Sequence, residues 1–318
     1  MSAFLPKDFI ETAEELIFAV VAAGEEAQRV LSFLRYQRSS AGYKKLSTRE
    51  ANELLENHYP AYLYYSRPRD VNLHGVPTEC IVHHHQPRQR LQALCRRACC
   101  DELEHKLRLL VDQFEVHGLN RQAIGVTGSL LIGAHTTHSD IDLVFYRRET
   151  FFKAREIVKR LLDKQFLHNL DDALWQDAYA RRGCSLTFEE FVWHERRKFN
   201  KAAIQQTKFD ISLLVPEQEL DSLSYRKKGK FKMKSRVTED RYSFDYPARY
   251  ELDHPSIGEV VSYTATFVGQ AHKGETVEVH GQLEISADGH QRIVVGSDRE
   301  ALGEYIKVLK SQDMSAVL

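Results

Sequence analysis

Two aspartates lie one residue apart, at positions 140 and 142, and a Gly128-Ser129 pair precedes them by ten intervening residues. The run Asp-Ile-Asp-Leu-Val-Phe-Tyr that starts at Asp140 alternates as a strand with one apolar face does. Asp140 and Asp142 should therefore project together from the other face. Carboxylate oxygens at this spacing suit Mg²⁺, which keeps several waters and takes its remaining ligands from substrate phosphates. The segment predicts a site for a metal-bound nucleotide.

Two further features strengthen this prediction. Gly128 and Ser129 follow a short apolar stretch, where a chain that turns from strand to helix exposes backbone N–H groups to a phosphate. A third carboxylate, Asp210, faces away from the apolar side chains of a later strand, residues 208–215. Three carboxylates on neighbouring strands can hold two Mg²⁺ ions about 3.5–4 Å apart, and Mn²⁺ could replace them. We assign Asp140 and Asp142 to bridging the metals, and Asp210 to the metal that would activate an acceptor hydroxyl.

The order Gly128-Ser129, ten residues, then Asp140-Ile-Asp142 resembles the signature of the DNA polymerase beta-like nucleotidyltransferase superfamily. More narrowly, the whole chain resembles a group of predicted nucleotidyltransferases best known from archaea, with extra domains at both ends. That likeness extends to residues 73–77, 189–200 and 261–268. The resemblance implies transfer of a nucleoside monophosphate from an NTP, with the Gly-Ser pair holding the triphosphate and the three aspartates binding metal. It leaves the acceptor open; ATP and CTP are the favoured donors.

Two basic segments are candidates for further contacts. In residues 195–201, Arg197 and Lys198 could reach triphosphate oxygens, and the alternative is a solvated helix face. Residues 230–236 alternate with period two, which places four cations on one face of a strand. This strip could follow the phosphates of a nucleic acid, or it could be an edge strand whose lysines prevent aggregation. Its cations are Lys230, Lys232, Lys234 and Arg236.

Histidines occur in two places that could attract a metal. The run His83-His84-His85 has spacings to the cysteines that match no zinc pattern, and a surface loop is the favoured interpretation. His135 and His138 precede Asp140 and could either touch substrate or shape the turn. We assign no metal to either group.

The elements that must position these residues indicate an α+β protein. We expect a small N-terminal α/β module (residues 1–87), a polymerase-beta-like nucleotidyltransferase domain with a mixed sheet and helices (88–222), and a β-rich, OB-like barrel domain (223–318). A hairpin over residues 15–35 and a helix with the Ser47/Glu50 capping box belong to the first. Turn material is expected over residues 71–78, and helices over 88–117, 152–167, 187–203 and 299–309.

The amino-acid composition excludes some classes of protein. The 318 residues carry 44 basic and 45 acidic side chains, so a net charge of −1 excludes a globally basic nucleic-acid binder. No apolar run approaches the roughly 18 residues of a membrane span. Five irregularly spaced cysteines are unlike a disulfide framework and favour a cytoplasmic protein. We expect a nucleotidyltransferase acting on RNA; a protein or small-molecule acceptor, or a non-catalytic RNA-binding nucleotide sensor, are the alternatives.

Overall fold

The computed structural model describes residues 4–98, 100–215, 225–297 and 301–310. The protein is a mixed α+β chain that forms two compact units. The first unit contains residues 1–168 and 202–216, and the second contains residues 169–201 and 217–318. The chain therefore leaves the first unit after His168 and returns to it at Ala202.

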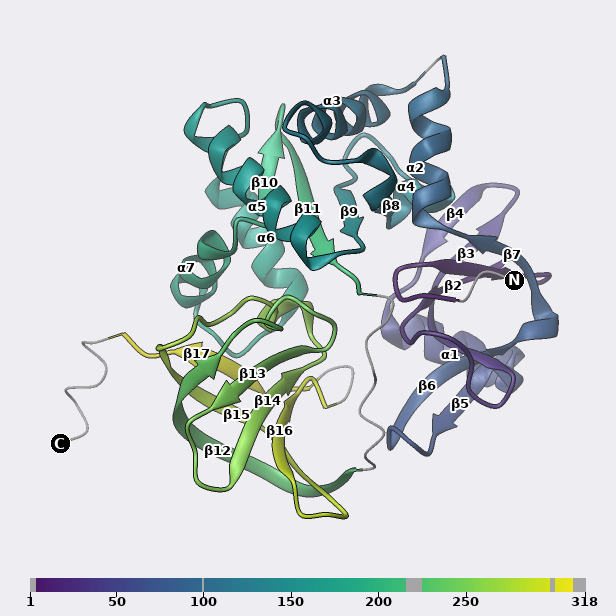
Figure 1. Ribbon diagram of the computed structural model, residues 1–318. Coiled ribbons are helices and arrows are strands. Elements are labelled where there is room, and N and C mark those ends of the chain that lie inside the picture. Colours follow the sequence, from purple (N-terminus) through teal and green to yellow (C-terminus); the bar gives the residue numbers. More distant parts are fainter. Residues whose placement is uncertain (1–3, 99, 216–224, 298–300, 311–318) are drawn as a thin grey trace. The chain divides into compact units, whose positions relative to one another are not determined.

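The first unit begins with a seven-stranded sheet, drawn in purple and blue in Figure 1, whose path is β5-β6-β3-β2-β1-β7, with β4 paired to β3. Helix α1 (Thr48–His58) starts at the predicted capping box of Ser47 and Glu50. The predicted hairpin is confirmed, because β2 and β3 pair antiparallel. The strands are β1 (Phe9–Thr12), β2 (Leu16–Val20), β3 (Arg29–Ser39), β4 (Gly42–Lys45), β5 (Leu63–Ser66), β6 (Val71–Pro77) and β7 (Ile81–His85).

Two sequence predictions in this sheet are wrong. Residues 71–77 form the strand β6 rather than turn material. Gly75 lies within this strand because Tyr64 of the neighbouring β5 packs closely against it: a Cβ on Gly75 would lie 2.8 Å from Tyr64 Cβ. The three histidines lie on strand β7 rather than in a loop. His84 Nε2 lies 2.8 Å from Asp8 Oδ2, so a buried carboxylate holds this strand to the N-terminal segment.

The expected helix over residues 88–117 is two helices, α2 (Pro87–Arg96) and α3 (Glu102–Val116). The break is explained by Asp101, whose side chain accepts a hydrogen bond from the backbone N–H of Glu104 and so caps α3. Apolar side chains of both helices are buried, including Leu91, Leu107 and Phe114.

A four-stranded sheet with the order β10-β11-β9-β8 follows in the first unit. Strands β9 and β11 are parallel, and β8 and β9 are antiparallel. The elements are β8 (Ile124–Thr127), α4 (Ser129–Ile132), β9 (Ile141–Phe145), α5 (Arg148–Asp163), β10 (Lys201–Ile204) and β11 (Thr207–Leu213). The sheet is mixed, as predicted, and Figure 1 draws its strands in teal and green.

The second unit combines two helices with a six-stranded sheet. Helix α6 (Asp172–Arg182) was not expected, and the helix predicted over residues 187–203 ends earlier, as α7 (Phe188–Lys198). The strands are β12 (Tyr225–Glu239), β13 (Ala248–Leu252), β14 (Ile257–Ser262), β15 (Thr276–Ser286), β16 (Gln291–Val295) and β17 (Tyr305–Val308). Residues 305–308 thus form a strand paired with β15, and the helix predicted over 299–309 is wrong where the structure describes it.

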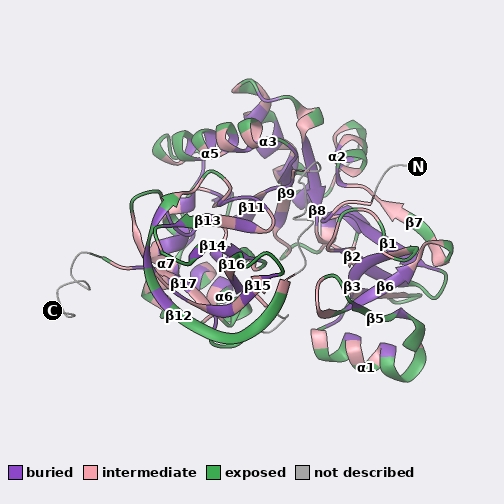
Figure 2. Ribbon diagram, turned by 60° about the horizontal axis from the view of Figure 1, so that its bottom comes forward, coloured by how far each residue is buried: buried purple, intermediate pink, exposed green. Residues whose placement is uncertain are grey.

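The second-unit sheet closes on itself. Strand β12 pairs with β13 at one edge and with β15 along most of its length, so five strands form a ring in the order β12-β13-β14-β16-β15. Within the ring β14 and β16 are parallel. Met233, Ser235 and Val237 of β12 are buried, and their neighbours in sequence are exposed. Figure 2 draws a long stretch of β12 as exposed. The predicted alternation of residues 230–236 is confirmed from Lys232 onward.

Candidate functional site

The three aspartates come together at the four-stranded sheet. Asp142 of β9 lies directly opposite Asp210 of β11 in the parallel ladder, and Asp140 is the second residue before Asp142. The alternate residues Ile141, Leu143 and Phe145 are fully buried, which fixes the other face of β9 in the core. Each of the three aspartates retains partial exposure. The sheet therefore presents a compact group of three carboxylates.

Gly128 lies next to the carboxylate of Asp142. Its φ is +66°, a region that strongly favours glycine, and it lies between β8 and the short helix α4, which starts at Ser129. A Cβ on Gly128 would collide with Asp142 Oδ2. Thr127, just before it, is the ladder partner of Asp142 on β8. Glycine is thus required here both by the backbone turn and by the approach of the carboxylate.

The electrostatics of the group differ from those of an ordinary surface cluster. Burial, together with the negative charges of Asp210 and Asp140, raises the pKa of Asp142 to about 6, although Lys7 and Lys208 oppose the shift. The positive charges of Lys7 and Lys208 thus do not offset the burial of Asp142 and the two negative charges beside it. The arrangement favours an additional cation, which could be a hard divalent metal ion.

Two lysines of the site were not predicted from the sequence. Lys208 Nζ lies 2.8 Å from Asp140 Oδ2, and the residue is only 6% exposed. Lys208 precedes Asp210 by two positions, so the period of a strand could have identified it. No sequence pattern near Lys7 could have identified it, because it belongs to the N-terminal segment. The backbone carbonyl of Lys7 accepts a hydrogen bond of 2.7 Å from the Thr127 hydroxyl.

Arg197 and Lys198 lie in the second unit, on α7, and both have partners there. Arg197 pairs with Glu275 and stacks over the Trp193 ring at 4.3 Å. Lys198 is 1% exposed and donates hydrogen bonds to Glu195 and, at 2.7 Å, to the Thr266 carbonyl. A triphosphate would have to compete with Glu195 for this ammonium group. Their predicted role in triphosphate binding stays a prediction.

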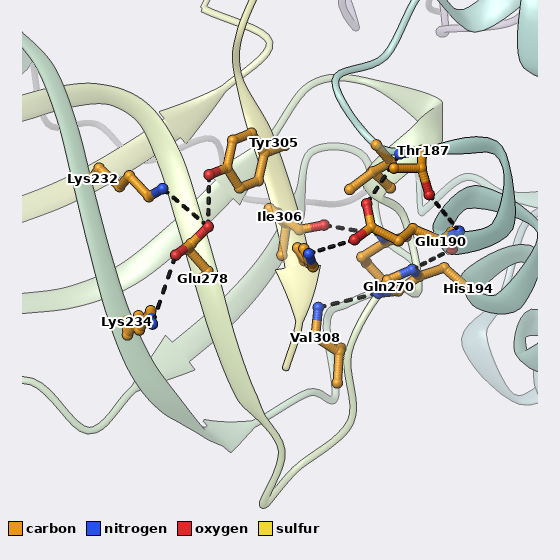
Figure 3. A network of polar contacts seen from close by, with 12 residues as sticks. Thr187, Glu190, His194, Lys232, Lys234, Gln270, Glu278, Tyr305, Ile306 and Val308 are labelled. Atoms are coloured by element: carbon orange, nitrogen blue, oxygen red, sulfur yellow. Dashed lines mark hydrogen bonds and ion pairs between the residues drawn. The ribbon is translucent and has the colours of Figure 1, made fainter. Parts of the chain in front are cut away.

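A cavity of about 720 Å³ lies beside the same helix. Aromatic side chains dominate its lining, and the Trp193 ring also lies 4.7 Å from Lys310 Nζ. The helix itself is fixed to the barrel by His194, whose Nε2 accepts a hydrogen bond of 3.1 Å from the Val308 N–H, as Figure 3 shows. Burial lowers the pKa of His194 to about 4, so this acceptor is neutral. The cavity is lined by Phe188, Glu189, Val192, Trp193, Arg196, Arg197, Phe199 and His272.

The basic strip of β12 is exposed, but acids of other barrel elements lie against it. Lys230 pairs with Glu304, and Lys232 lies 3.1 Å from Glu278 of β15. Lys234 is 3.9 Å from the same carboxylate, which Figure 3 shows between the two lysines. The Arg236 guanidinium donates to the Gly274 carbonyl. Pairing across the sheet therefore reduces the charge that the sequence alone assigns to this strip.

The chain is thus an α+β protein, and the three aspartates of its first unit could bind a divalent cation. The chain is 35% identical over 336 aligned residues to "Uncharacterized protein MJ1086" of Methanocaldococcus jannaschii, covering 95% of this chain and 98% of that protein. The chain belongs to the same family as this archaeal protein. No protein-family model matches the chain, and no solved structure matches it. Among the described helices, none is long and apolar enough to cross a membrane.

Proposed function

We propose that the protein is a Mg²⁺-dependent nucleotidyltransferase that moves a nucleoside monophosphate from an NTP, with ATP or CTP favoured, to an acceptor hydroxyl and releases pyrophosphate. The observation that carries this proposal is the ladder pairing of Asp142 with Asp210, with Gly128 in contact with the Asp142 carboxylate. The glycine at φ +66° leaves room for the Asp142 carboxylate, whose raised pKa supports a role in cation binding.

The residues of the site have separate tasks in this proposal. Asp140, Asp142 and Asp210 provide the oxygen ligands that Mg²⁺ prefers. Bound Mg²⁺ would supply neutralisation of the charge that develops on the transferred phosphoryl group. Gly128 and Ser129 open the start of α4 towards the triphosphate, and Asp210 orients the acceptor hydroxyl. Lys208 holds Asp140 in place at 2.8 Å.

The finer fold assignments belong to the same proposal. The mixed sheet that carries the carboxylates on β9 and β11 is the part that we interpret as a polymerase-beta-like core. The ring of five strands in the second unit, with β14 parallel to β16, supports an OB-like barrel. Barrels of this type bind oligonucleotides on an exposed face, which favours RNA as the acceptor.

The acceptor is the least constrained part of the proposal. Lys232 and Lys234 remain about half exposed, so they could contact phosphates, although Glu278 lies between them. A protein or small-molecule acceptor would not need this strip. The ion pairs with Glu278 and Glu304, which reduce the charge of the strip, are the observation that supports such an acceptor as the alternative to RNA.

The experiment is transfer of label from the α-phosphate of each NTP, with Mg²⁺ or Mn²⁺, into total RNA, transfer RNA or a cell lysate. The test variant is Asp142→Asn, which keeps the side-chain volume, and the matched control is Asp163→Asn at the exposed end of α5. Label that enters an acceptor with the intact protein and the control, but not with Asp142→Asn, supports the proposal. Equal labelling by all three proteins, or no labelling and no NTP-dependent pyrophosphate release, overturns it.

A further inference from the structure

A second group of potential ligands lies in the first unit, outside the three aspartates. It consists of Asp101 and Glu104, at the start of α3, and His135, in the loop between α4 and β9. One ligand atom from each of these residues lies within 4.8 Å of the others. The loop that carries His135 ends at Asp140, so this group holds the segment that leads into the carboxylate centre.

The side chains of the group are already in contact with one another. His135 Nε2 lies 2.7 Å from Asp101 Oδ2. The other oxygen of Asp101 accepts a hydrogen bond of 2.8 Å from the Glu104 N–H, which fixes the carboxylate. The carboxylate of Asp101 is thus held beside His135 at the start of α3.

Two buried atoms beside this contact lack a partner among the described residues. Glu104 is 2% exposed; its Oε1 accepts a hydrogen bond of 2.9 Å from Arg97, but its Oε2 has no hydrogen-bond partner. The His135 side chain is 10% exposed, and its Nδ1 also has none. Buried polar atoms are rarely left unsatisfied, and a bound ion is one of the usual reasons. A carboxylate oxygen without a donor, next to a histidine and a second carboxylate, points to a cation.

We propose that Asp101, Glu104 and His135 bind a divalent first-row transition metal ion, with Zn²⁺ as the best match. The imidazole nitrogen distinguishes this site from the all-oxygen centre of the three aspartates, because transition metals accept nitrogen and Mg²⁺ favours oxygen. The ion binds a nitrogen lone pair of the neutral imidazole, which keeps its single proton on the other ring nitrogen, and replaces the hydrogen bond between His135 and Asp101. The two carboxylates contribute two negative charges, and Arg97 remains on Glu104 Oε1. The bound ion fixes the loop before Asp140 to the start of α3.

The test uses Zn²⁺ alone, titrated by calorimetry into the full-length protein after removal of metal by a chelator. The test variants are His135→Ala and Glu104→Gln, and the matched control is His138→Ala, an exposed histidine of the same loop. All four proteins carry Asp142→Asn as well, so that the aspartate centre does not contribute binding. We expect the parent and His138→Ala to bind one ion more than His135→Ala, and Glu104→Gln to bind at least about 10-fold more weakly.

Thermal unfolding with and without Zn²⁺ distinguishes loss of the metal site from poor folding of a variant. The midpoint of the parent and of His138→Ala should rise with Zn²⁺, and that of His135→Ala should not. Equal Zn²⁺ binding by the parent and both test variants would place the ion elsewhere, for example on the histidines of β7, and would overturn the proposal. Absence of Zn²⁺ binding in the parent would do the same. Neither result bears on nucleotidyl transfer, which is measured with Mg²⁺.

Discussion

Each unit of the protein contains a group of buried charges, and the two groups are balanced differently. In the first unit, Asp142 lies opposite Asp210 on neighbouring strands, and burial with like charges raises its pKa to about 6. In the second unit, Glu195 is 3% exposed, yet its pKa falls to about 2, because Lys198 and Lys201 outweigh the effect of burial. The carboxylate of Glu195 lies 2.5 Å from each lysine nitrogen.

Under the proposed function, this difference separates a site that acts on a ligand from a network that holds a helix. The Glu195 network supplies its own cations, so it needs nothing from solution. The aspartate group instead leaves Asp142 with a raised pKa, and strongly perturbed carboxylates are more frequent at functional sites. Charge balance, rather than burial alone, therefore distinguishes the two.

The largest expected effect concerns the aspartates. Asp210→Asn should lower nucleotidyl transfer by on the order of 10³-fold, because a metal ligand is lost while the shape of the side chain is kept. Label transfer under saturating Mg²⁺ measures this effect, with Asp163→Asn as the control. Urea unfolding of the same protein should show no loss of stability. If the Asp210→Asn protein kept its activity, the aspartate group would not differ in function from the Glu195 network.

The opposite pattern is expected for the second unit. Glu195→Gln leaves two buried lysines without their carboxylate and should lower the free energy of unfolding by about 3–5 kcal/mol. Urea denaturation measures this loss, and Glu189→Gln, on the exposed face of the same helix α7, is the matched control. A change below about 1 kcal/mol, the range of an exposed ion pair, would show that the network is not structural.

The sequence predicted the aspartate group because its information is local. Gly128, Asp140 and Asp142 lie in one short segment, and the alternation around Asp210 identifies its strand face. The approach of Gly128 to Asp142 Oδ2 lies within the same segment, but it depends on the antiparallel pairing of β8 with β9, which was not predicted.

Other features depend on contacts between distant residues and could not be predicted in this way. Lys7 acts on Asp142 from the N-terminal segment, and Glu278 acts on Lys232 through the pairing of β12 with β15. Strand β17 was expected as helix because its spacing is compatible with both, and only its pairing with β15 decides between them. The partners of His135 similarly become visible only when α3 and the loop are placed together.

The raised pKa of Asp142 also predicts how the stability of the protein depends on pH. The pKa of Asp142 rises from its usual 3.8 to about 6, so between these values the folded metal-free protein binds more protons than the unfolded chain. Its stability should therefore fall as the pH rises from about 4 to about 6, by at most about 3 kcal/mol. Urea unfolding at several pH values measures this fall. Asp142→Asn should abolish it, and saturating Mg²⁺ should offset it in the parent protein. A metal-free protein whose stability rises through this range would contradict the raised pKa.

The smallest expected effect concerns the basic strip, where charge balance again sets the outcome. Lys232 and Lys234 share Glu278, so each offers a phosphate less charge than an isolated lysine would. Substitution to glutamine avoids new repulsion with Glu278, which glutamate would introduce. If RNA binds here, each of Lys232→Gln and Lys234→Gln should reduce the slope of log K against log salt concentration by at most about 0.7. Binding of a labelled oligoribonucleotide at several salt concentrations measures the slope, with Lys159→Gln on α5 as the control. A slope that stays unchanged in the double variant would exclude the strip from RNA binding, and the acceptor would then be sought among proteins and small molecules.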